Sequence, residues 1–368
     1  MKRRALWAML TVLALVVAAC GGDGGGDATT TTAAPAEDTT TTEAAPEETT
    51  TTESTEAELG SAERPIQVLF VPSVDAQIIV SGGEIMDEAL TEATGLEFEV
   101  SVPTSYAATI EEMCANPTDT IGFIPAFGYV LASQLCQVDV GFKAVRFGWG
   151  VYWAQFLVPR DSDIQSLDDL EGLSWAYPDP GSTSGFLFPS VSLDEAGVEP
   201  GETVEAGGHP QAALAVYSGE ADFATTFFSP PLIEGGEWQV GDDPEIPDDL
   251  VESCAPTDEG ELWCGDYRVL DARASAIEDA PDIVQQVRIL DITQEIPNDT
   301  LSFGPDFPED LRAQIEDALA AFAETPEWEE SIGHQDFYAW SGIEPATDAE
   351  YDIVRTVVEQ QGITLDDL

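Results

Sequence analysis

The chain has 368 residues and a formal net charge of -59 at pH 7, from 71 acidic and 12 basic side chains. This charge excludes nucleic acid as a partner and excludes a basic membrane-binding face, because both need clustered lysine and arginine. The apolar share of 43% is enough for packed cores.

The first twenty residues have the pattern of an export signal. Three basic residues after Met1 precede an apolar stretch at 5–19, and Cys20-Gly21 follows. The stretch is too short for a membrane span, which needs about 20 apolar residues. We expect a lipoprotein signal peptide at 1–20, with Cys20 as the lipidated N-terminus of an exported protein held in the periplasm or at the outer face of the cytoplasmic membrane.

Residues 21–63 consist mainly of Gly, Thr, Ala, Pro, Glu and Asp, and runs of four threonines recur every ten residues. Such a segment cannot bury enough apolar surface to fold, so it predicts a disordered tether. The remaining region, 64–368, is long enough for two lobes with their own cores.

Four cysteines remain after Cys20, an even number for an exported domain, which predicts two disulfides. We favour pairing Cys114 with Cys136 and Cys254 with Cys264, because each pair lies within one segment. A zinc site is the alternative, although the spacings differ from paired Cys-x-x-Cys motifs.

The folded region starts with alternating strand and helix patterns. We predict strands at 66–71, 96–102 and 120–124, and helices at 84–94, 105–114 and 129–135. These repeated units predict a mainly parallel sheet with helices on both faces.

The same alternation restarts further along the chain. We predict strands at 155–158, 173–177 and 221–227, and helices at 167–170, 186–196, 211–218, 308–324 and 351–360. Residues 235–265 are rich in Pro, Gly and acids and predict a surface excursion. Two α/β lobes whose strand ends face each other would form a ligand crevice between them.

Three consecutive hydroxyl residues, Ser182, Thr183 and Ser184, lie between the strand at 173–177 and the helix that follows. The free amides of a first helical turn carry about half a positive charge, so the turn predicts an oxyanion site that needs no cation. Two other interpretations stay open. The hydroxyls can simply cap the helix, or the turn can be a nucleophile elbow, although that motif needs serine where Thr183 lies.

Several short segments resemble, in order, the phosphate/phosphite/phosphonate-binding proteins of ABC transporters. They are Tyr106-Ala107-Ala108, Leu167 to Gly172, Asp179 to Phe186, Gly208-His209, Ala213 to Val216, Gly219 to Asp222 and Ile296-Pro297-Asn298-Asp299. The resemblance covers nearly all of 64–368. It implies a type II periplasmic-binding fold, with two α/β lobes joined by two hinge strands. Lobe I would comprise 64–152 plus 300–368, and lobe II 153–299.

The resemblance also implies a ligand set and a function. The matching residues are Tyr106, Tyr152, Ser182, Thr183, Ser184, His209 and Asp299. The implied protein captures a small phosphorus oxyanion and passes it to a membrane permease. It would be a monomer without cofactor, metal or catalytic activity.

Two positions refine the expected ligand. Family members that bind aminoalkylphosphonates have a second carboxylate where this chain has Ser229. Without it an ammonium group would be buried unpaired, which favours phosphate, phosphite or methylphosphonate. A carboxylate facing an oxyanion needs a hydrogen between them, so Asp299 predicts a ligand with a P–OH group.

Three other functions remain open at this stage. The same fold could bind another small anion, such as a carboxylate or a sulfonate. A secreted hydrolase could use His209, Ser184 and Asp222 as a triad. A sensor subunit that feeds a signalling receptor would share the ligand site.

Overall fold

The computed structural model describes residues 57–365 and 368. The predicted signal peptide with Cys20, and the tether up to residue 56, lie outside the described residues. The folded region begins before the predicted boundary at Arg64, since Leu59 is buried, the Gly60 N–H donates to the Arg64 carbonyl and the Gly60 carbonyl accepts the Glu97 N–H. Leu59 is an apolar residue at the end of an otherwise polar segment, and its burial in the first core fixes this start.

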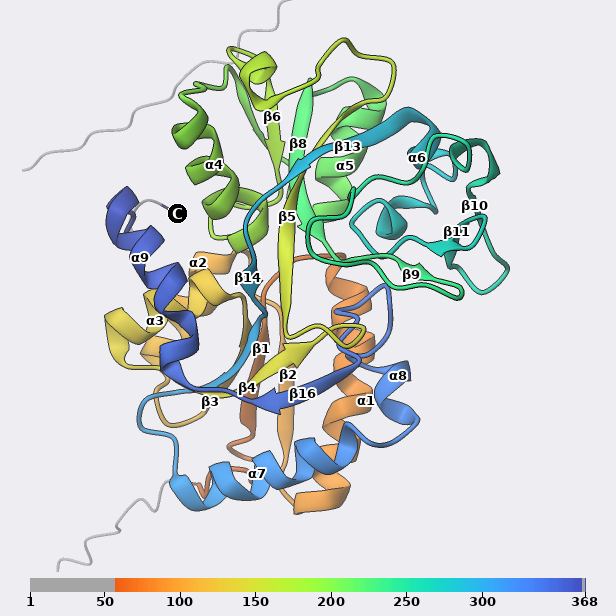
Figure 1. The fold of residues 1–368 in the computed structure, drawn as a ribbon. Helices are drawn as coiled ribbons and strands as arrows, with labels where there is room; N and C mark the ends of the chain where they lie inside the picture. Colours follow the sequence, from red (N-terminus) through yellow and green to blue (C-terminus); the bar gives the residue numbers. More distant parts are fainter. Residues whose placement is uncertain (1–56, 366–367) are drawn as a thin grey trace, which may run out of the picture. The chain divides into compact units, whose positions relative to one another are not determined.

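The first sheet has the strand order β16-β4-β15-β3-β1-β2 (Figure 1). Its strands are β1 (Ile66–Phe70), β2 (Phe98–Ser101), β3 (Thr120–Ile124), β4 (Asp139–Val145), β15 (Thr300–Phe303) and β16 (Gly342–Pro345). β1 pairs in parallel with β2 and β3, whereas β15 is antiparallel to both β3 and β4, and β16 is antiparallel to β4. The three strands on which the prediction of a parallel sheet rested, β1, β2 and β3, are parallel as predicted. The sheet as a whole is mixed, because β15 arrives from a distant part of the chain without a crossover helix.

The second sheet has the order β13-β5-β8-β6-β7, with β14 paired to β5. Its strands are β5 (Val151–Pro159), β6 (Trp175–Tyr177), β7 (Thr203–Glu205), β8 (Phe223–Phe228), β13 (Val287–Ile292) and β14 (Ile296–Pro297). β6 is parallel to β7 and β8, and β5 is antiparallel to β8 and β13. The chain passes between the two sheets from β4 to β5 and again from β14 to β15. The residue boundaries of the lobes stay a prediction.

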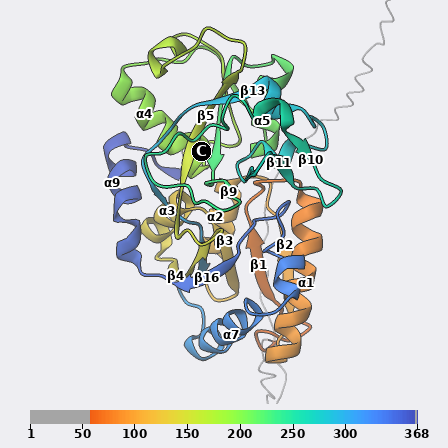
Figure 2. The same cartoon turned by 45° about the vertical axis from the view of Figure 1, so that its right-hand side comes forward.

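The helices cover these sheets (Figures 1 and 2). They are α1 (Ala76–Thr94), α2 (Tyr106–Ala115), α3 (Ala126–Cys136), α4 (Phe188–Ala196), α5 (His209–Ser218), α6 (Ile283–Gln286), α7 (Glu309–Phe322), α8 (Glu327–Glu330) and α9 (Asp352–Gln361). α1 starts at Ala76, before the predicted start at residue 84. Gly82 and Gly83, which weaken the helical signal, lie inside it because Phe337 and Val100 pack against them with no room for a side chain.

The acidic excursion at 235–265 takes part in a small antiparallel sheet of order β10-β11-β12-β9, with β9 (Leu232–Ile233), β10 (Ala255–Pro256), β11 (Leu262–Cys264) and β12 (Tyr267–Arg268). The disulfides Cys114–Cys136 and Cys254–Cys264 are both present, which confirms the predicted pairing. All four thiols are used in S–S bonds, so the alternative of a zinc site is wrong.

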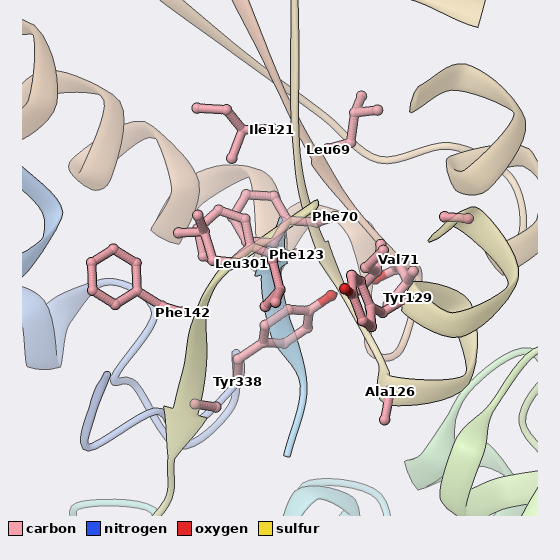
Figure 3. Close-up of a cluster of buried hydrophobic side chains, with 14 of the residues drawn as sticks. Leu69, Phe70, Val71, Ile121, Phe123, Ala126, Tyr129, Phe142, Leu301 and Tyr338 are labelled. Carbon is pink, nitrogen blue, oxygen red and sulfur yellow. The ribbon is translucent and has the colours of Figure 1, made fainter. Parts of the chain in front are cut away.

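The largest core cluster surrounds the first sheet, and Figure 3 shows part of it. Phe70 and Phe123 stack there with ring centroids 4.4 Å apart. Within residues 57–365 and 368, no helix is long and apolar enough to cross a membrane, and no group of three or more His, Cys, Asp or Glu residues could hold a metal ion.

Candidate functional site

A cavity of about 80 Å³ is lined by residues from segments that flank both sheets. Six of the seven residues predicted to bind the ligand line it, namely Tyr106, Tyr152, Ser182, Ser184, His209 and Asp299. They come from positions up to 193 residues apart, so the fold brings together what the sequence separates. The seventh residue, Thr183, does not line the cavity.

The hydroxyl turn is built by a local sequence. β6 ends at Tyr177, and Ser182 caps a π-helical turn, Thr183–Leu187, that leads into α4. The Ser182 hydroxyl oxygen accepts the Gly185 N–H at 3.0 Å. Since the oxygen serves as the acceptor, its O–H remains a donor toward the cavity. The capping interpretation is therefore confirmed, and it is compatible with an anion site at the same turn.

Thr183 is not among the residues that line the cavity. Its hydroxyl oxygen accepts the Phe127 N–H at 2.9 Å, at the start of α3 on the first sheet. Two further bonds connect the same regions: the His209 N–H donates to the Ser73 carbonyl at 3.2 Å, and the Tyr106 N–H donates to Asp179 at 3.5 Å. Thr183 thus connects the hydroxyl turn of the second sheet to a helix of the first.

His209 is the first residue of α5 and only 6% of its surface is exposed. Its Nδ1 accepts the Phe227 N–H at 3.3 Å, which places the ring hydrogen on Nε2, 3.4 Å from the Ser182 hydroxyl oxygen. Burial, reinforced by the positive charge of Arg146, lowers the pKa of His209 from 6.5 to about 3. His209 is therefore a neutral hydrogen-bond donor at physiological pH.

Two tyrosines add hydroxyl groups. Tyr106 starts α2 directly after its cap, Ser105, and Tyr152 lies in β5. Burial raises the pKa of both hydroxyls, and the nearby carboxylate of Asp299 raises each further. Both therefore keep their protons and can donate to an anion. Tyr338 also lines the cavity, but its hydroxyl already donates to the Val71 carbonyl at 2.9 Å.

Arg146 is the cationic lining residue that the sequence analysis missed. It follows β4 directly, and its guanidinium donates to the Asp299 carboxylate at 2.5 Å, to the Asn298 side-chain oxygen at 3.2 Å and to the Tyr338 carbonyl at 3.0 Å. The cavity thus has a cation in its lining, which the sequence analysis did not expect. Its sequence signal is weak: an arginine at the end of a strand, in a chain with 12 basic residues.

Each carboxylate in the lining has an arginine partner. Asp299 pairs with Arg146, and Asp271 binds Arg273 through both carboxylate oxygens at 3.0 Å. Ser229 also lines the cavity and is buried. The site therefore contains neutral donors, one cation and two compensated carboxylates.

The hydrolase triad is not assembled. Asp222 accepts hydrogen bonds from the backbone N–H and the hydroxyl of Ser174, at 2.9 and 2.7 Å, and it does not line the cavity. Nδ1 of His209 faces a backbone N–H, whereas a triad needs a carboxylate there. The triad hypothesis is therefore wrong.

Known proteins resemble this chain in sequence and in fold. The family model for the periplasmic substrate-binding protein of phosphonate ABC transporters matches residues 68–351. The phosphate-import protein PhnD of Mycolicibacterium smegmatis is 28% identical over 330 residues, which cover 84% of this chain and 89% of that protein.

Two solved structures share the fold. One is a binding protein component of an ABC phosphonate transporter from Pseudomonas aeruginosa, with a TM-score of 0.60, 19% identity and coverage of 80% of this chain and 85% of that one. The other is PhnD1 from Prochlorococcus marinus in complex with methylphosphonate, with a TM-score of 0.60, 14% identity and coverage of 82% and 98%. They confirm the type II periplasmic-binding fold. Because the family model spans most of the chain, this protein belongs to the periplasmic substrate-binding proteins of phosphonate ABC transporters.

Proposed function

We propose that the ligand is a compact phosphorus oxyanion, namely phosphate, phosphite or a small phosphonate, held in the cavity between the two sheets. The observation that carries this proposal is the convergence of neutral donors on one small space, from Ser182, Ser184, His209 and the two tyrosines, with Arg146 beside them. Fixed donors in a site shielded from water bind an oxyanion strongly.

The size of the cavity supports a compact ligand. Its volume of about 80 Å³ is roughly half that of an engineered apolar cavity of about 150 Å³ that binds benzene. Phosphate and methylphosphonate each have five non-hydrogen atoms. A relative is named for phosphate import, and a structural neighbour was solved with methylphosphonate, which agrees with this class.

Asp299 selects the protonation state of the ligand. Its Oδ2 takes the hydrogen bond from Arg146, and Oδ1 can accept a hydrogen from a P–OH group. Affinity for phosphite or methylphosphonate should therefore fall as pH rises through the last ionisation of the ligand, which removes the P–OH hydrogen. The neighbouring groups keep their charge in this range: the pKa of His209 is about 3, those of Tyr106, Tyr152 and Tyr338 are raised by burial, and the arginine is always charged.

An aminoalkylphosphonate fits this cavity poorly. Ser229 offers no charge, and Asp271 is already bound by Arg273. A ligand ammonium group would lose its water and gain no unpaired carboxylate, which is costly. We expect 2-aminoethylphosphonate to bind more weakly than methylphosphonate.

The protein binds and releases its ligand without breaking a bond. Closure of the two lobes around the anion would present a bound form to the permease. We also propose that the protein is a monomer anchored through a lipid on Cys20, with the segment from residue 21 to about 56 as its tether, and with lobe boundaries near residues 152 and 299. Mass spectrometry of the membrane fraction tests the anchor, since an unmodified Cys20 would contradict it.

The experiment that tests the proposed function is calorimetric titration of the protein, stripped of bound anions, with phosphate, phosphite, methylphosphonate and 2-aminoethylphosphonate. Sulfate and acetate are the controls. We expect micromolar or tighter affinity for at least one compact phosphorus anion, equal to about -8 kcal/mol. If all phosphorus compounds fail to bind, or if sulfate or acetate binds best, the proposal is wrong.

A further inference from the structure

Arg146 is held from three directions at the wall of the cavity. Its Nε donates to the Tyr338 carbonyl, one terminal nitrogen to Asn298 and the other to Asp299. Only 13% of the side chain is exposed. A guanidinium has five N–H donors. Within the described part of the chain, these bonds use three of them, which leaves two for a ligand in the cavity that Arg146 lines.

The backbone that follows Arg146 forms a tight turn. Arg146 and Trp149 exchange two backbone hydrogen bonds at 3.0 and 2.8 Å across a two-residue turn, Phe147-Gly148. Both turn residues have positive φ, 52° for Phe147 and 86° for Gly148. A bulky side chain in this region is unfavourable, so the surroundings must hold the turn.

The Asn298 side chain helps to keep the turn in this conformation. Its amide nitrogen donates to the carbonyls of Ala144 and Trp149, at 2.9 Å each, on the two sides of the turn. Its side-chain oxygen accepts from Arg146. The Asn298-Asp299 pair therefore fixes both the turn and the guanidinium that the turn carries.

We propose that Arg146 binds the ligand directly and that Arg146 and Asp299 together recognise a singly protonated oxyanion. The two remaining N–H groups of Arg146 donate to a P–O⁻ oxygen, while Asp299 accepts the hydrogen of P–OH. A donor and an acceptor side by side match the two kinds of oxygen on such an anion. This inference rests on the proposed function of the same cavity.

The charges around the cavity support separate roles for Arg146 and Asp299. Without Arg146, the Asp299 carboxylate would face an anion with only neutral donors nearby, because His209 is uncharged. With Arg146, the pair is neutral overall, and each residue has a distinct task. Arg146 supplies affinity, and Asp299 supplies selectivity against sulfate, which has the same shape but no proton to donate at neutral pH.

The test compares single and double variants of the full-length protein, purified in mild detergent and stripped of anions, at pH 7.5. Phosphate and sulfate are titrated into the wild type, Arg146→Gln, Asp299→Asn and the double variant. Lys143→Gln is the matched control, because Lys143 lies in β4, three residues before Arg146, and its ammonium pairs with Glu350 outside the cavity.

We expect Arg146→Gln to lower phosphate affinity at least tenfold while sulfate stays excluded. Asp299→Asn should gain affinity for sulfate, and the double variant should lose less phosphate affinity than the product of the two single losses, because no unpaired charge remains. Lys143→Gln should bind as the wild type does.

A folded Arg146→Gln variant that binds phosphate within twofold of the wild type would overturn the role of Arg146. If Arg146→Gln does not fold, Arg146→Met, which is similar in length and uncharged, replaces it, and wild-type affinity in that variant would overturn the inference equally. Failure of Asp299→Asn to bind sulfate would overturn the division of roles. A wild type that binds no phosphorus anion would instead refute the proposed function itself.

Discussion

Replacing His209 with glutamine should change how the stability of the protein depends on pH. The imidazole is buried between the Phe227 N–H and the Ser182 hydroxyl, and no carboxylate is hydrogen-bonded to either nitrogen in the described structure. Glutamine is similar in length and polar, but it does not titrate. The substitution therefore removes one proton-binding group from the core of the site.

The size of the effect follows from the pKa of His209, which folding lowers from 6.5 to about 3. The folded state binds fewer protons than the unfolded state between these values, so the contribution to stability is complete above pH 6.5 and is lost as pH falls toward 3. At pH 5.0, about 1.5 units below 6.5, a cost of 1.36 kcal/mol per unit gives a loss of about 2 kcal/mol.

The assay is urea unfolding of the ligand-free wild type and of His209→Gln at pH 7.5 and pH 5.0. The wild type should lose about 2 kcal/mol more than the variant between the two conditions. His334→Gln is the control, since His334 is 54% exposed and lies outside the cavity. Parallel losses in the wild type and His209→Gln would refute the reasoning, as would the same difference in His334→Gln.

Three further predictions concern binding and stability. Thr183→Ala should lower ligand affinity about tenfold, because the Phe127 N–H loses its acceptor, whereas Thr183→Ser should keep it; equal calorimetric affinities for the two variants would contradict this role. The dissociation constant for methylphosphonate should rise by about tenfold per pH unit above its last ionisation, which removes the P–OH hydrogen, and a constant value from about pH 5.5 to 8.5 would remove the P–OH contact. Replacing Cys114 and Cys136 with serine should lower the free energy of unfolding by about 3 kcal/mol, given their separation of 22 residues, and unchanged guanidinium unfolding would contradict that estimate.

Features that depend on neighbouring residues could be predicted from the sequence. The end of β6, the cap at Ser182 and the start of α4 follow from Pro, Gly and hydroxyl residues within one short segment. β3 was predicted with its observed bounds, 120–124, because its apolar run is bounded by clear turn residues. The alternation of strands and helices gave the α/β class for the same local reason.

Features that depend on distant residues could not be predicted from the sequence. The mixed direction of the first sheet is set by β15, which enters between β3 and β4 from about 160 residues further along the chain. Arg146 has no local sign of function, since its partners Asn298 and Tyr338 lie 152 and 192 residues away. The family resemblance pointed to Asp299 but not to the arginine that it holds.

The most direct test of the central claim is a crystal structure of the protein with the phosphorus anion that binds most tightly. We predict that its oxygens lie within hydrogen-bond distance of the Ser182 and Ser184 hydroxyls, Nε2 of His209 and the guanidinium of Arg146, with one oxygen facing Asp299. An anion bound elsewhere, or bound in this cavity without contact to the Ser182–Ser184 turn, would contradict the claim.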